Sequence, residues 1–375
     1  MVTIRDVARR AGVAPSTVSY VFNGSRSISE ETRRRVQEAV DALGYHPRAS
    51  ARTLRSSRTH VLALALPRAA GLQDSVDGRF AIDVSDAANG LGYDLLLTTS
   101  QDKAEGLRRV ALSGLADAAV LMAVDMEDAR IDVVRELAFP AALIGRPADE
   151  DALPWTDLDW EEAAALAVRE LAAAGHRDMV YLAPGEREVE GRRSYALRGI
   201  AGARRGARTT GAAVTVVHSV ADPARLADRL RTVLGNPDAD AGDGGGAGGA
   251  AGAGRGDGGG AAPTALIVQH PSAHHHILPS VTATGLRVPE DLAVVVIGTL
   301  PGDPASRALP RVELPVETLS FEVTWLAVAA AARQREGGAP SVTEPGARLL
   351  AESVGHLLIP PVLLPGTAPL APPRH

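Results

Sequence analysis

Polar side chains cluster near the N-terminus at the spacing of a DNA-reading helix. The short side chains of Ser16, Thr17 and Ser19 lie at the start of a predicted helix, and Tyr20 follows one turn later. The segment before them, residues 4–11, has apolar residues at helical spacing and ends at Gly12. Two helices joined by such a turn form a helix-turn-helix, in which short polar side chains of the second helix approach base edges in the major groove. The chemistry predicted for this region is sequence-specific binding of double-stranded DNA.

The charge distribution supports a DNA-binding segment at this end of the chain. The formal net charge is −6 over 375 residues, which alone argues against nucleic acid. Residues 1–60 nevertheless carry eleven arginines against five acidic residues, so the acidic excess belongs to the remainder. A basic head on an acidic body is typical of a DNA-binding module joined to a carrier that does not itself bind DNA.

Catalysis and metal binding have little support in the sequence. The chain has no cysteine, which excludes disulfides and thiolate chemistry. No Gly-x-Ser-x-Gly elbow, dinucleotide fingerprint or metal triad occurs in its required context, so we expect neither an enzyme nor a cofactor. His270 and His274 have the spacing of a helical zinc pair, but no carboxylate or cysteine completes the set, and a histidine-rich surface helix is favoured. No apolar run reaches the length of a membrane helix and no signal peptide is recognisable, so we expect a cytoplasmic protein without a membrane partner.

The pattern of apolar residues changes near residue 60. Before it, three helices are predicted, with Thr3 and Ser29 placed to cap the first and third and Gly44 to end the third. After it, short apolar runs alternate with longer amphipathic segments, which indicates parallel sheets covered by helices on both faces. The runs are 61–66, 95–98, 118–123, 141–144, 179–183, 214–217, 265–269 and 293–297. The Gly/Ala-rich stretch 240–260 predicts a disordered insert, and the proline-rich residues 360–375 a loosely held tail.

Several segments of the chain resemble the LacI/GalR family of transcription regulators. The headpiece segments are TIRDVARRAGVAPSTVSYVFNG and ISEETRRRVQEAVDALGYHPRASARTLRSSRT, and body segments such as FPAALIGRP and GLRVPEDLAVVVIG follow in family order. The resemblance implies a small all-α helix-turn-helix domain followed by an α/β body. The body is expected to have the periplasmic-binding-protein fold, in which two doubly wound parallel-sheet subdomains flank an effector cleft.

The resemblance assigns two kinds of DNA contact to the headpiece. The residues expected to face base edges are Ser16, Thr17, Tyr20 and Arg26. The residues expected at phosphates are Thr3, Ser19, Asn23, Thr32, Tyr45 and Arg48. Phosphate contacts fix the register, whereas base contacts specify the sequence. Family members usually have Arg or His where Tyr20 stands, so the preferred operator is expected to differ.

Residues 47–58 match the hinge helix of the family. A helix this short is marginal in isolation, so it should order mainly on DNA. By resemblance, the hinge helices of a dimer enter the minor groove, where Leu54 of each chain is pushed between base steps and Arg55 makes a minor-groove contact. The hinge is therefore the expected switch between the body and the DNA.

The expected effector cleft departs from the family pattern in several places. Gly145 and Gly298 stand where an Asp often follows a strand, an Arg and an aromatic residue are replaced by Ala196 and Ile200, and Gln269-His270 replaces Asn-Asp. These departures suggest that a polyhydroxylated sugar is not bound in the usual way. The candidates to line the remaining pocket are Arg146, Trp155, Asp159, Trp160, Gln269 and His270. Arg146 also suggests an anionic effector, with an ordinary salt-bridged loop arginine as the alternative.

The predicted division of the chain has four parts: a helix-turn-helix domain (1–46), a hinge (47–58), a first subdomain (59–160 plus 291–322) and a second (161–290 plus 323–375). The predicted function is a repressor that binds a pseudo-palindromic operator as a homodimer, or as a tetramer, under the control of a small molecule. It would work in the cytoplasm, at the nucleoid when DNA-bound. Two alternatives stay open: a regulator with a degenerate cleft that responds to a protein partner or to nothing, and a solute-binding module with an incidental headpiece.

Overall fold

The computed structural model describes residues 2–23, 28–44, 58–66, 74–235, 262–269, 274–302, 307–336, 355–368 and 370. The chain divides into two compact units, residues 1–59 and residues 60–375. Several sequence-predicted features lie outside the described residues: Arg26, Tyr45, Arg48, Leu54, Arg55, His270 and the insert 240–260.

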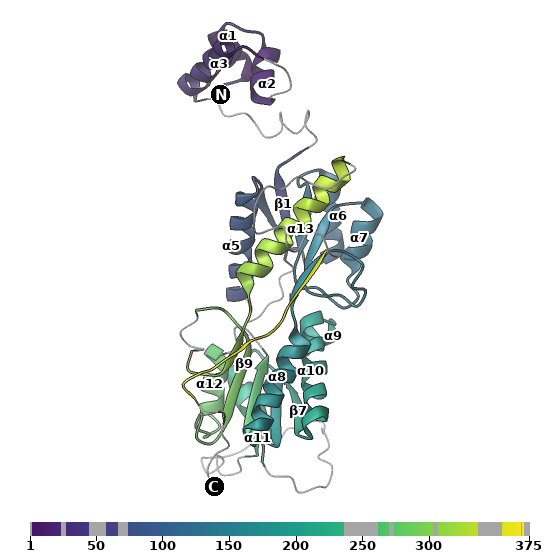
Figure 1. Cartoon of the computed structure of the whole chain (residues 1–375), viewed down its shortest axis with the longest axis vertical. Coiled ribbons are helices and arrows are strands. Elements are labelled where there is room, and N and C mark those ends of the chain that lie inside the picture. The colour runs from purple at the N-terminus through teal and green to yellow at the C-terminus, as the bar shows by residue number, and fades with distance from the viewer. Residues whose placement is uncertain are drawn as a thin grey trace. The chain divides into compact units, whose positions relative to one another are not determined.

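The described part of the N-terminal unit contains three helices around a small apolar core (Figure 1). They are α1 (Ile4–Ala11), α2 (Pro15–Asn23) and α3 (Glu30–Leu43). The buried core side chains are Val7, Ala8, Ala11, Val18, Val36 and Ala39. The predicted helix ends are confirmed, because Gly12 and Gly44 adopt left-handed conformations with φ of 65° and 58°. The Ser29 hydroxyl accepts a hydrogen bond from the Thr32 amide, as predicted for a helix cap.

In its described residues, the second unit is built on two sheets of six strands each. The first sheet has the order β11-β5-β4-β3-β1-β2 and the second the order β12-β10-β9-β8-β6-β7. The strands of the first sheet are β1 (Val61–Ala65), β2 (Asp94–Thr98), β3 (Ala118–Leu121), β4 (Ala141–Ile144), β5 (Trp155–Leu158) and β11 (His356–Ile359). Those of the second are β6 (Asp178–Ala183), β7 (Ala213–His218), β8 (Ala265–Gln269), β9 (Ala293–Thr299), β10 (Arg311–Glu313) and β12 (Leu363–Leu364). The described pairs are parallel except β10 with β12, and all eight predicted runs are strands, which confirms the predicted fold class.

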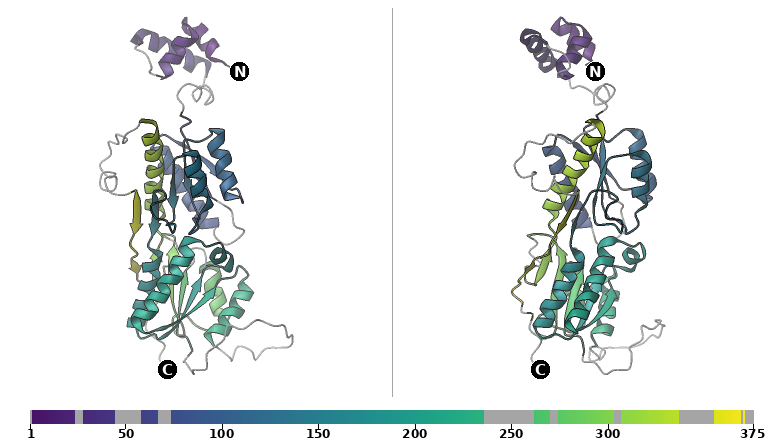
Figure 2. Two further views of the ribbon diagram at one scale, coloured as in Figure 1. Left: turned by 90° about the vertical axis from the view of Figure 1, so that its right-hand side faces the viewer. Right: turned by 45° about the vertical axis from the view of Figure 1, so that its right-hand side comes forward.

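Helices cover both faces of each sheet (Figure 2). In the first sheet, Leu62 and Leu64 of β1 belong to one apolar cluster and Ala63 and Ala65 to another, because successive side chains point to opposite faces. One face carries α5 (Asp74–Gly90) and α13 (Val316–Glu336), and the other carries α6 (Lys103–Ser113) and α7 (Ala129–Leu137). The second sheet is covered likewise by α8 (Trp160–Ala173) and α10 (Ser194–Thr210) on one face and by α11 (Pro223–Leu234) and α12 (His274–Thr282) on the other, with α9 (Glu186–Glu190) leading into α10. We call the first sheet with its helices the N-subdomain and the second the C-subdomain.

The division between subdomains differs from the predicted one at the return segments. Within the described residues the chain crosses three times, after β5, β10 and β11. Residues 291–322 were assigned to the N-subdomain, but their strands β9 and β10 pair with each other, and β9 pairs with β8 in the C-subdomain. Residues 323–375 were assigned to the C-subdomain, but most of α13 packs on the N-subdomain sheet and β11 pairs with β5. The sequence carries no clear sign of the return after β10, because this strand (RVE) is short and partly polar.

The proline-rich C-terminal segment is not a loose tail where the structure describes it. Strand β12 pairs with β10, and the Ala368 amide donates to the Ala308 carbonyl at 3.0 Å. The buried His176 ring is hydrogen-bonded to the Leu370 carbonyl through Nε2 and to the Thr264 hydroxyl through Nδ1. Figure 1 shows this segment, in yellow, running from the N-subdomain onto the C-subdomain. No described helix is long and apolar enough to cross a lipid bilayer.

Helices α8 and α10 lie in direct backbone contact. A Cβ atom at Gly202 would stand 2.0 Å from the Glu161 carbonyl oxygen, and one at Gly206 would stand 2.8 Å from Cβ of Val168. Only glycine at position 202 allows α10 to lie this close, so the spacing of the two helices depends on it.

We expect Gly202→Ala to lower the stability of the body by about 1–3 kcal/mol, because an added methyl group forces the two helices apart. Chemical denaturation of the full chain, followed by its helical signal, measures the change. Gly78→Ala in α5 is the matched control, since a Cβ there meets nothing within 4 Å. The control should gain about 0.5–1 kcal/mol from alanine's better helix propensity. Equal effects of the two substitutions would contradict the close contact.

Candidate nucleic-acid interface and effector cleft

Helix α2 presents the predicted base-reading residues away from the headpiece core. Ser16 is exposed and Thr17 and Tyr20 are half-buried, whereas Val18 of the same helix is fully buried. Ser19, a predicted phosphate contact, is only 8% exposed, so little of it is available to DNA. Ser19 is less exposed than Ser16 because its place on the helix is beside the apolar stripe that faces the core. Asn23 ends α2.

Two further predicted phosphate contacts lie at helix starts. Thr3 precedes α1, and both its amide and its hydroxyl donate to the Asp6 carboxylate, at 2.9 and 2.6 Å. These hydrogen bonds hold the pKa of Asp6 below its usual value. Thr32 lies in the first turn of α3 with its hydroxyl 2.9 Å from that of Ser29. The amides of both threonines therefore already have acceptors within the headpiece, and the phosphate contacts remain predictions.

Arg35 of α3 holds the turn between α1 and α2. Its Nε donates to the Ala11 carbonyl at 3.1 Å, and its Nη2 donates to the carbonyls of Ala11 and Gly12. These carbonyls end α1 and lack helical partners, and a guanidinium also favours the negative end of the helix dipole. A Cβ at Gly12 would stand 2.9 Å from Nη2, so the glycine also leaves room for the arginine. Arg35 therefore positions α2 without belonging to it, a role that the sequence analysis did not recognise.

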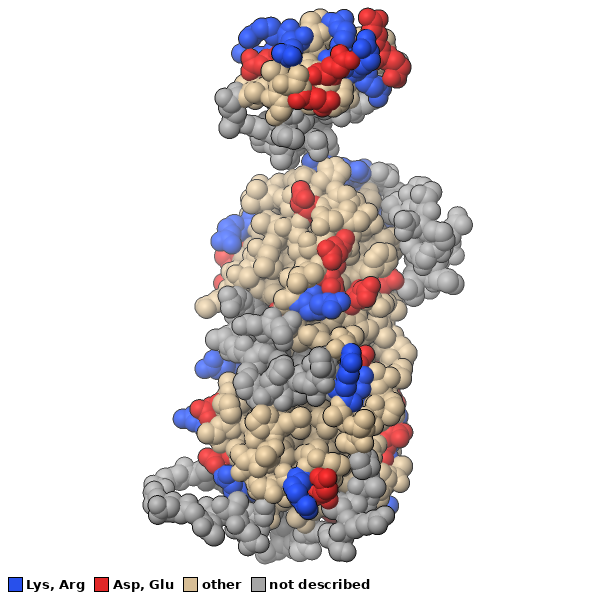
Figure 3. All heavy atoms as spheres, turned by 90° about the vertical axis from the view of Figure 1, so that its left-hand side faces the viewer, with Lys and Arg blue, Asp and Glu red and all other residues tan. Residues whose placement is uncertain are grey.

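Charge is distributed differently over the two units. Figure 3 shows charged side chains of both signs crowded on the headpiece and more widely spaced on the body face that carries α5. Within the headpiece, Arg34 is paired with Glu38 at 2.8 Å on the surface of α3. Arg33 lies 3.7 Å from Glu30. These two arginines pair with carboxylates of α3 itself, whereas Arg35 donates to the end of α1.

Arg146 and Trp155, two predicted pocket residues, are in contact but not in an open pocket. The Arg146 guanidinium lies 5.8 Å from the Trp155 ring centroid and 3.7 Å from the Glu150 carboxylate. The Trp155 indole donates to the Glu150 carbonyl at 3.0 Å. Arg198 of α10 reaches the same loop and donates to the Pro147 carbonyl at 2.9 Å and to Glu150 at 3.3 Å. The loop arginine is thus packed into the contact between the subdomains.

Asp157 lies under this contact and is fully buried against Trp160. The Trp160 indole donates to one oxygen of Asp157 at 2.9 Å, and the Arg146 amide donates to the other at 3.0 Å. Burial outweighs these hydrogen bonds and raises the pKa of Asp157 to about 7. Asp159 caps α8 by accepting from the Glu162 amide at 3.0 Å. Arg146 and Trp160, the two hydrogen-bond partners of Asp157, were predicted pocket residues, whereas Asp157 itself was not predicted.

Gln269 is enclosed within the C-subdomain. It is 1% exposed, accepts from the Tyr181 hydroxyl at 2.8 Å and donates to the Tyr195 carbonyl at 2.7 Å. A Cβ at Gly199 would stand 2.3 Å from its amide oxygen, so α10 closes directly over it. Both ends of the amide are satisfied internally, which leaves no free group for a ligand.

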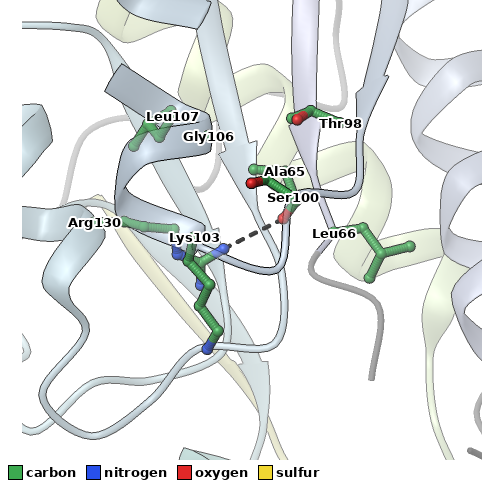
Figure 4. Close-up of a pocket in the computed structure, with 8 residues that line it drawn as sticks. All are labelled: Ala65, Leu66, Thr98, Ser100, Lys103, Gly106, Leu107 and Arg130. Carbon is green, nitrogen blue, oxygen red and sulfur yellow. Dashed lines mark hydrogen bonds between the residues drawn. The ribbon is translucent and has the colours of Figure 1, made fainter. Parts of the chain in front are cut away.

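A small hollow remains at the carboxyl ends of β1 and β2 (Figure 4). Its lining includes Thr98, Ser100, Lys103 and Arg130, and its volume is about 10 Å³, enough for about one water molecule. Arg130 is fully buried, pairs with Asp128 at 2.6 Å and donates to the Ala65 and Met122 carbonyls. Arg130 holds the pKa of Asp128 at about 2. This hollow is too small for a metabolite.

Two family models match the chain. Residues 3–48 match bacterial regulatory proteins of the lacI family, and residues 168–350 match a periplasmic binding protein-like domain. The chain is 30% identical over 184 residues to catabolite control protein A of Priestia megaterium, which covers 48% of this chain and 54% of that protein. It is 35% identical over 150 residues to the HTH-type transcriptional regulator MalR of Streptococcus pneumoniae, which covers 39% of this chain and 46% of MalR. The chain spans about half the length of the curated relatives it matches.

Solved structures share the fold. The lac repressor dimer bound to operator and the anti-inducer ONPF superposes with a TM-score of 0.73 at 19% identity, over 97% of both chains. The transcriptional regulator CelR–cellobiose complex superposes with a TM-score of 0.59 at 21% identity, over 97% of this chain and 98% of CelR. The chain therefore combines a headpiece that matches the lacI family model with a body that matches a periplasmic binding protein-like domain. The lacI family match over residues 3–48 and the shared fold agree with the resemblance found in the sequence.

We expect Arg35→Met to weaken binding of a selected operator by roughly tenfold, because charge-assisted hydrogen bonds are worth about 1.5–3 kcal/mol and the turn that sets α2 loses them. Fluorescence anisotropy of the full chain with labelled duplex measures the loss. Arg34→Met removes only the exposed pair with Glu38, so its effect should stay below about 1 kcal/mol. Equal losses in the two variants would point to general charge attraction instead of positioning.

Asp157 should make stability fall as pH rises. Its pKa in the folded chain is about 7, above the value of 3.8 for a free Asp side chain, so between these values the folded state keeps a proton that the unfolded state has released. Stability from this group is therefore present below about pH 4 and lost by about pH 7, by at most about 4 kcal/mol. Asp157→Asn should flatten this dependence in thermal unfolding at pH 5 and pH 8. The control Asp132→Asn, at an exposed site, should leave the pH dependence of stability unchanged. If Asp157→Asn also left it unchanged, Asp157 would not be the group responsible.

Proposed function

We propose that this protein is a transcription repressor that binds a specific operator through its headpiece. One observation carries the proposal: the LacI family match over residues 3–48 coincides with a compact three-helix unit whose α2 presents Ser16, Thr17 and Tyr20 outward. Thr3 and Thr32 add phosphate contacts, and Arg35 fixes the angle of α2. The protein has no catalytic role in this proposal, since its matched relatives are regulators.

A homodimer is the assembly that suits such an operator. A dimer reads two half-sites related by symmetry, so the operator would be pseudo-palindromic. Ile82 of α5 is 60% exposed and Leu97 of the edge strand β2 is 48% exposed. Apolar side chains on an open strand edge favour contact with a second copy of the chain. The lac repressor structure is itself described as a dimer bound to operator. A tetramer is the second possibility.

The hinge residues Leu54 and Arg55 keep their proposed minor-groove role. Both lie outside the described residues, and their assignment rests on the resemblance. Arg26, Tyr45 and Arg48 are proposed as DNA contacts on the same ground. A regulator of this kind acts in the cytoplasm, at the nucleoid while it is bound to DNA.

The proposal also includes a small-molecule effector that binds between the subdomains and controls DNA affinity. Ligands of open α/β sheets bind at the carboxyl ends of strands. The CelR structure is described as a cellobiose complex, which supports a sugar-type effector for this fold. Here Trp155, Trp160 and Gln269 make hydrogen bonds within the chain. Arg146 contacts the Trp155 ring and Glu150, while its buried Nε has no hydrogen-bond partner among the described residues. This observation favours the second candidate, a family member whose degenerate cleft leaves it constitutive or controlled by a protein partner.

We expect the wild-type chain to select an inverted repeat from a randomised duplex library, and Tyr20→Arg to select a different half-site, because arginine makes a bidentate contact with guanine that tyrosine cannot make. Gln37→Arg is the matched control. It adds the same charge on the exposed face of α3, so it should strengthen binding to all duplexes without changing the motif. A wild-type selection that enriches no motif would overturn the proposed function. A motif unchanged by Tyr20→Arg would remove Tyr20 from the base-reading residues.

A further inference from the structure

A short backbone bridge joins the two subdomains. It connects the loop that follows β3, residues 123–127, with residues 192–194 at the start of α10, and we call these two segments the clasp. Asp125 and Arg193 form an antiparallel bridge. The Ser194 amide donates to the Val124 carbonyl at 3.0 Å, and the Met126 amide donates to the Arg192 carbonyl at 2.8 Å. Backbone groups of one subdomain thus satisfy those of the other.

Charged side chains reinforce the clasp. The Arg193 guanidinium donates to one oxygen of Asp125 and, at 2.8 Å, to the Ala123 carbonyl. Lys103 donates to the other oxygen of Asp125 at 2.5 Å. The three charged side chains are only 15%, 19% and 18% exposed, so salt screens them weakly. Burial lowers the pKa of Lys103. A bidentate pair between Arg192 and Glu127, at 2.6 and 3.1 Å, adds a more exposed contact.

The backbone is strained on both sides of the clasp. Ala123 in the N-subdomain has a φ of 52°, and Arg192 in the C-subdomain has a φ of 56°. Residues with a Cβ rarely adopt this left-handed conformation, and they keep it only where surrounding contacts hold it. Each strained residue is directly next to a residue that makes an interdomain hydrogen bond. The contacts of the clasp are therefore strong enough to maintain an unfavourable backbone in both partners.

The clasp also fills the space beside the end of β4. Gly145, the residue after β4, has a φ of 124°, and a Cβ there would stand 2.9 Å from Cβ of Val124 and 3.4 Å from Oγ of Ser194. A side chain at position 145 and the clasp cannot occupy this space together. The carboxyl end of β4, where a ligand would meet side chains of the cleft, is covered by the chain itself.

We propose that the clasp replaces a bound effector and holds the two subdomains together without a ligand. A small molecule in such a cleft acts by contacting both halves better in one arrangement than in another. In this chain Asp125, Arg193 and the backbone of Val124 and Ser194 supply contacts to both halves, and the space beside Gly145 is full. The consequence for regulation rests on the proposed function: the body would stay in one state whether or not metabolites are present.

The absence of cysteine allows a direct test on the full chain. Asp132→Cys in α7 and Ala201→Cys in α10 place one nitroxide on the exposed surface of each subdomain, and pulsed electron paramagnetic resonance measures the distance between them. The otherwise wild-type chain should show one narrow distance distribution without any ligand. Arg193→Met should add a second population at longer distance. Lys103 stays beside Asp125 in this variant, so no carboxylate is left unpaired and the body should fold.

Matched variants separate the clasp from general effects of charge. Arg108→Met removes the bidentate Arg108–Glu136 pair, at 2.8 and 2.6 Å, which lies within the N-subdomain, and should leave the distribution narrow. Ala123→Gly tolerates the left-handed conformation and should return part of the second population to the short distance when combined with Arg193→Met. Arg193→Gln keeps a side chain that can form hydrogen bonds but removes the charge, so it should also add the longer-distance population. This variant replaces Arg193→Met in the experiment if Arg193→Met does not fold.

Two results would overturn the clasp: a broad or two-component distribution in the ligand-free parent, or folded Arg193 variants that match the parent. Operator binding is measured separately on the same proteins. A parent that binds no duplex selectively would refute the proposed function and leave the distance result standing. An unchanged distance with intact operator binding would refute the clasp alone.

Discussion

A parallel sheet brings the carboxyl ends of all its strands to one edge, and the arrangement of this body depends on that constraint. Loops after β3 and β4 in the N-subdomain meet the start of α10 in the C-subdomain. Backbone groups in such loops have no ladder to join, so they must find partners in ligand, water or protein. Here they find protein, through the amides of Ser194 and Met126 and the guanidinium of Arg198. What elsewhere forms a binding site is here a contact between two halves of one chain.

Strand and helix positions followed from the sequence wherever apolar periodicity was strong. The buried runs of β1, β4 and β8 were recognised because both faces of their sheets are covered, which makes the runs continuously apolar. Strand β5 was missed because Thr156 and Asp157 interrupt its pattern, although both are buried. Strands β11 and β12 were missed because the prolines between them indicated a loop. Their places depend on pairing with distant strands, and no local pattern reports such pairing.

The candidate site shows a different limit. The sequence indicated Arg146, Trp155 and Trp160 as pocket residues, yet no pattern in it could show that Arg146 lies against the Trp155 ring or that the Trp160 indole donates to Asp157. Whether Gln269 faces a cavity or a tyrosine hydroxyl depends on side-chain contacts across 88 residues of chain. Arg35 illustrates the same point in the headpiece, since three consecutive arginines carry no signal of which one turns toward α1. One clue was available: Gly145 departs from an acidic family pattern, and the clasp occupies the space of its missing side chain.

The short strand β12 matters beyond its two residues. It covers the outer edge of β10, and the chain after it is anchored by the hydrogen bonds of Ala368 with Ala308 and of Leu370 with His176. An uncovered strand edge offers a row of unpaired amides and carbonyls to other molecules. Loss of residues 364–375, by proteolysis or by a premature stop codon, would therefore uncover the edge of β10 and make the chain prone to aggregate through its C-subdomain.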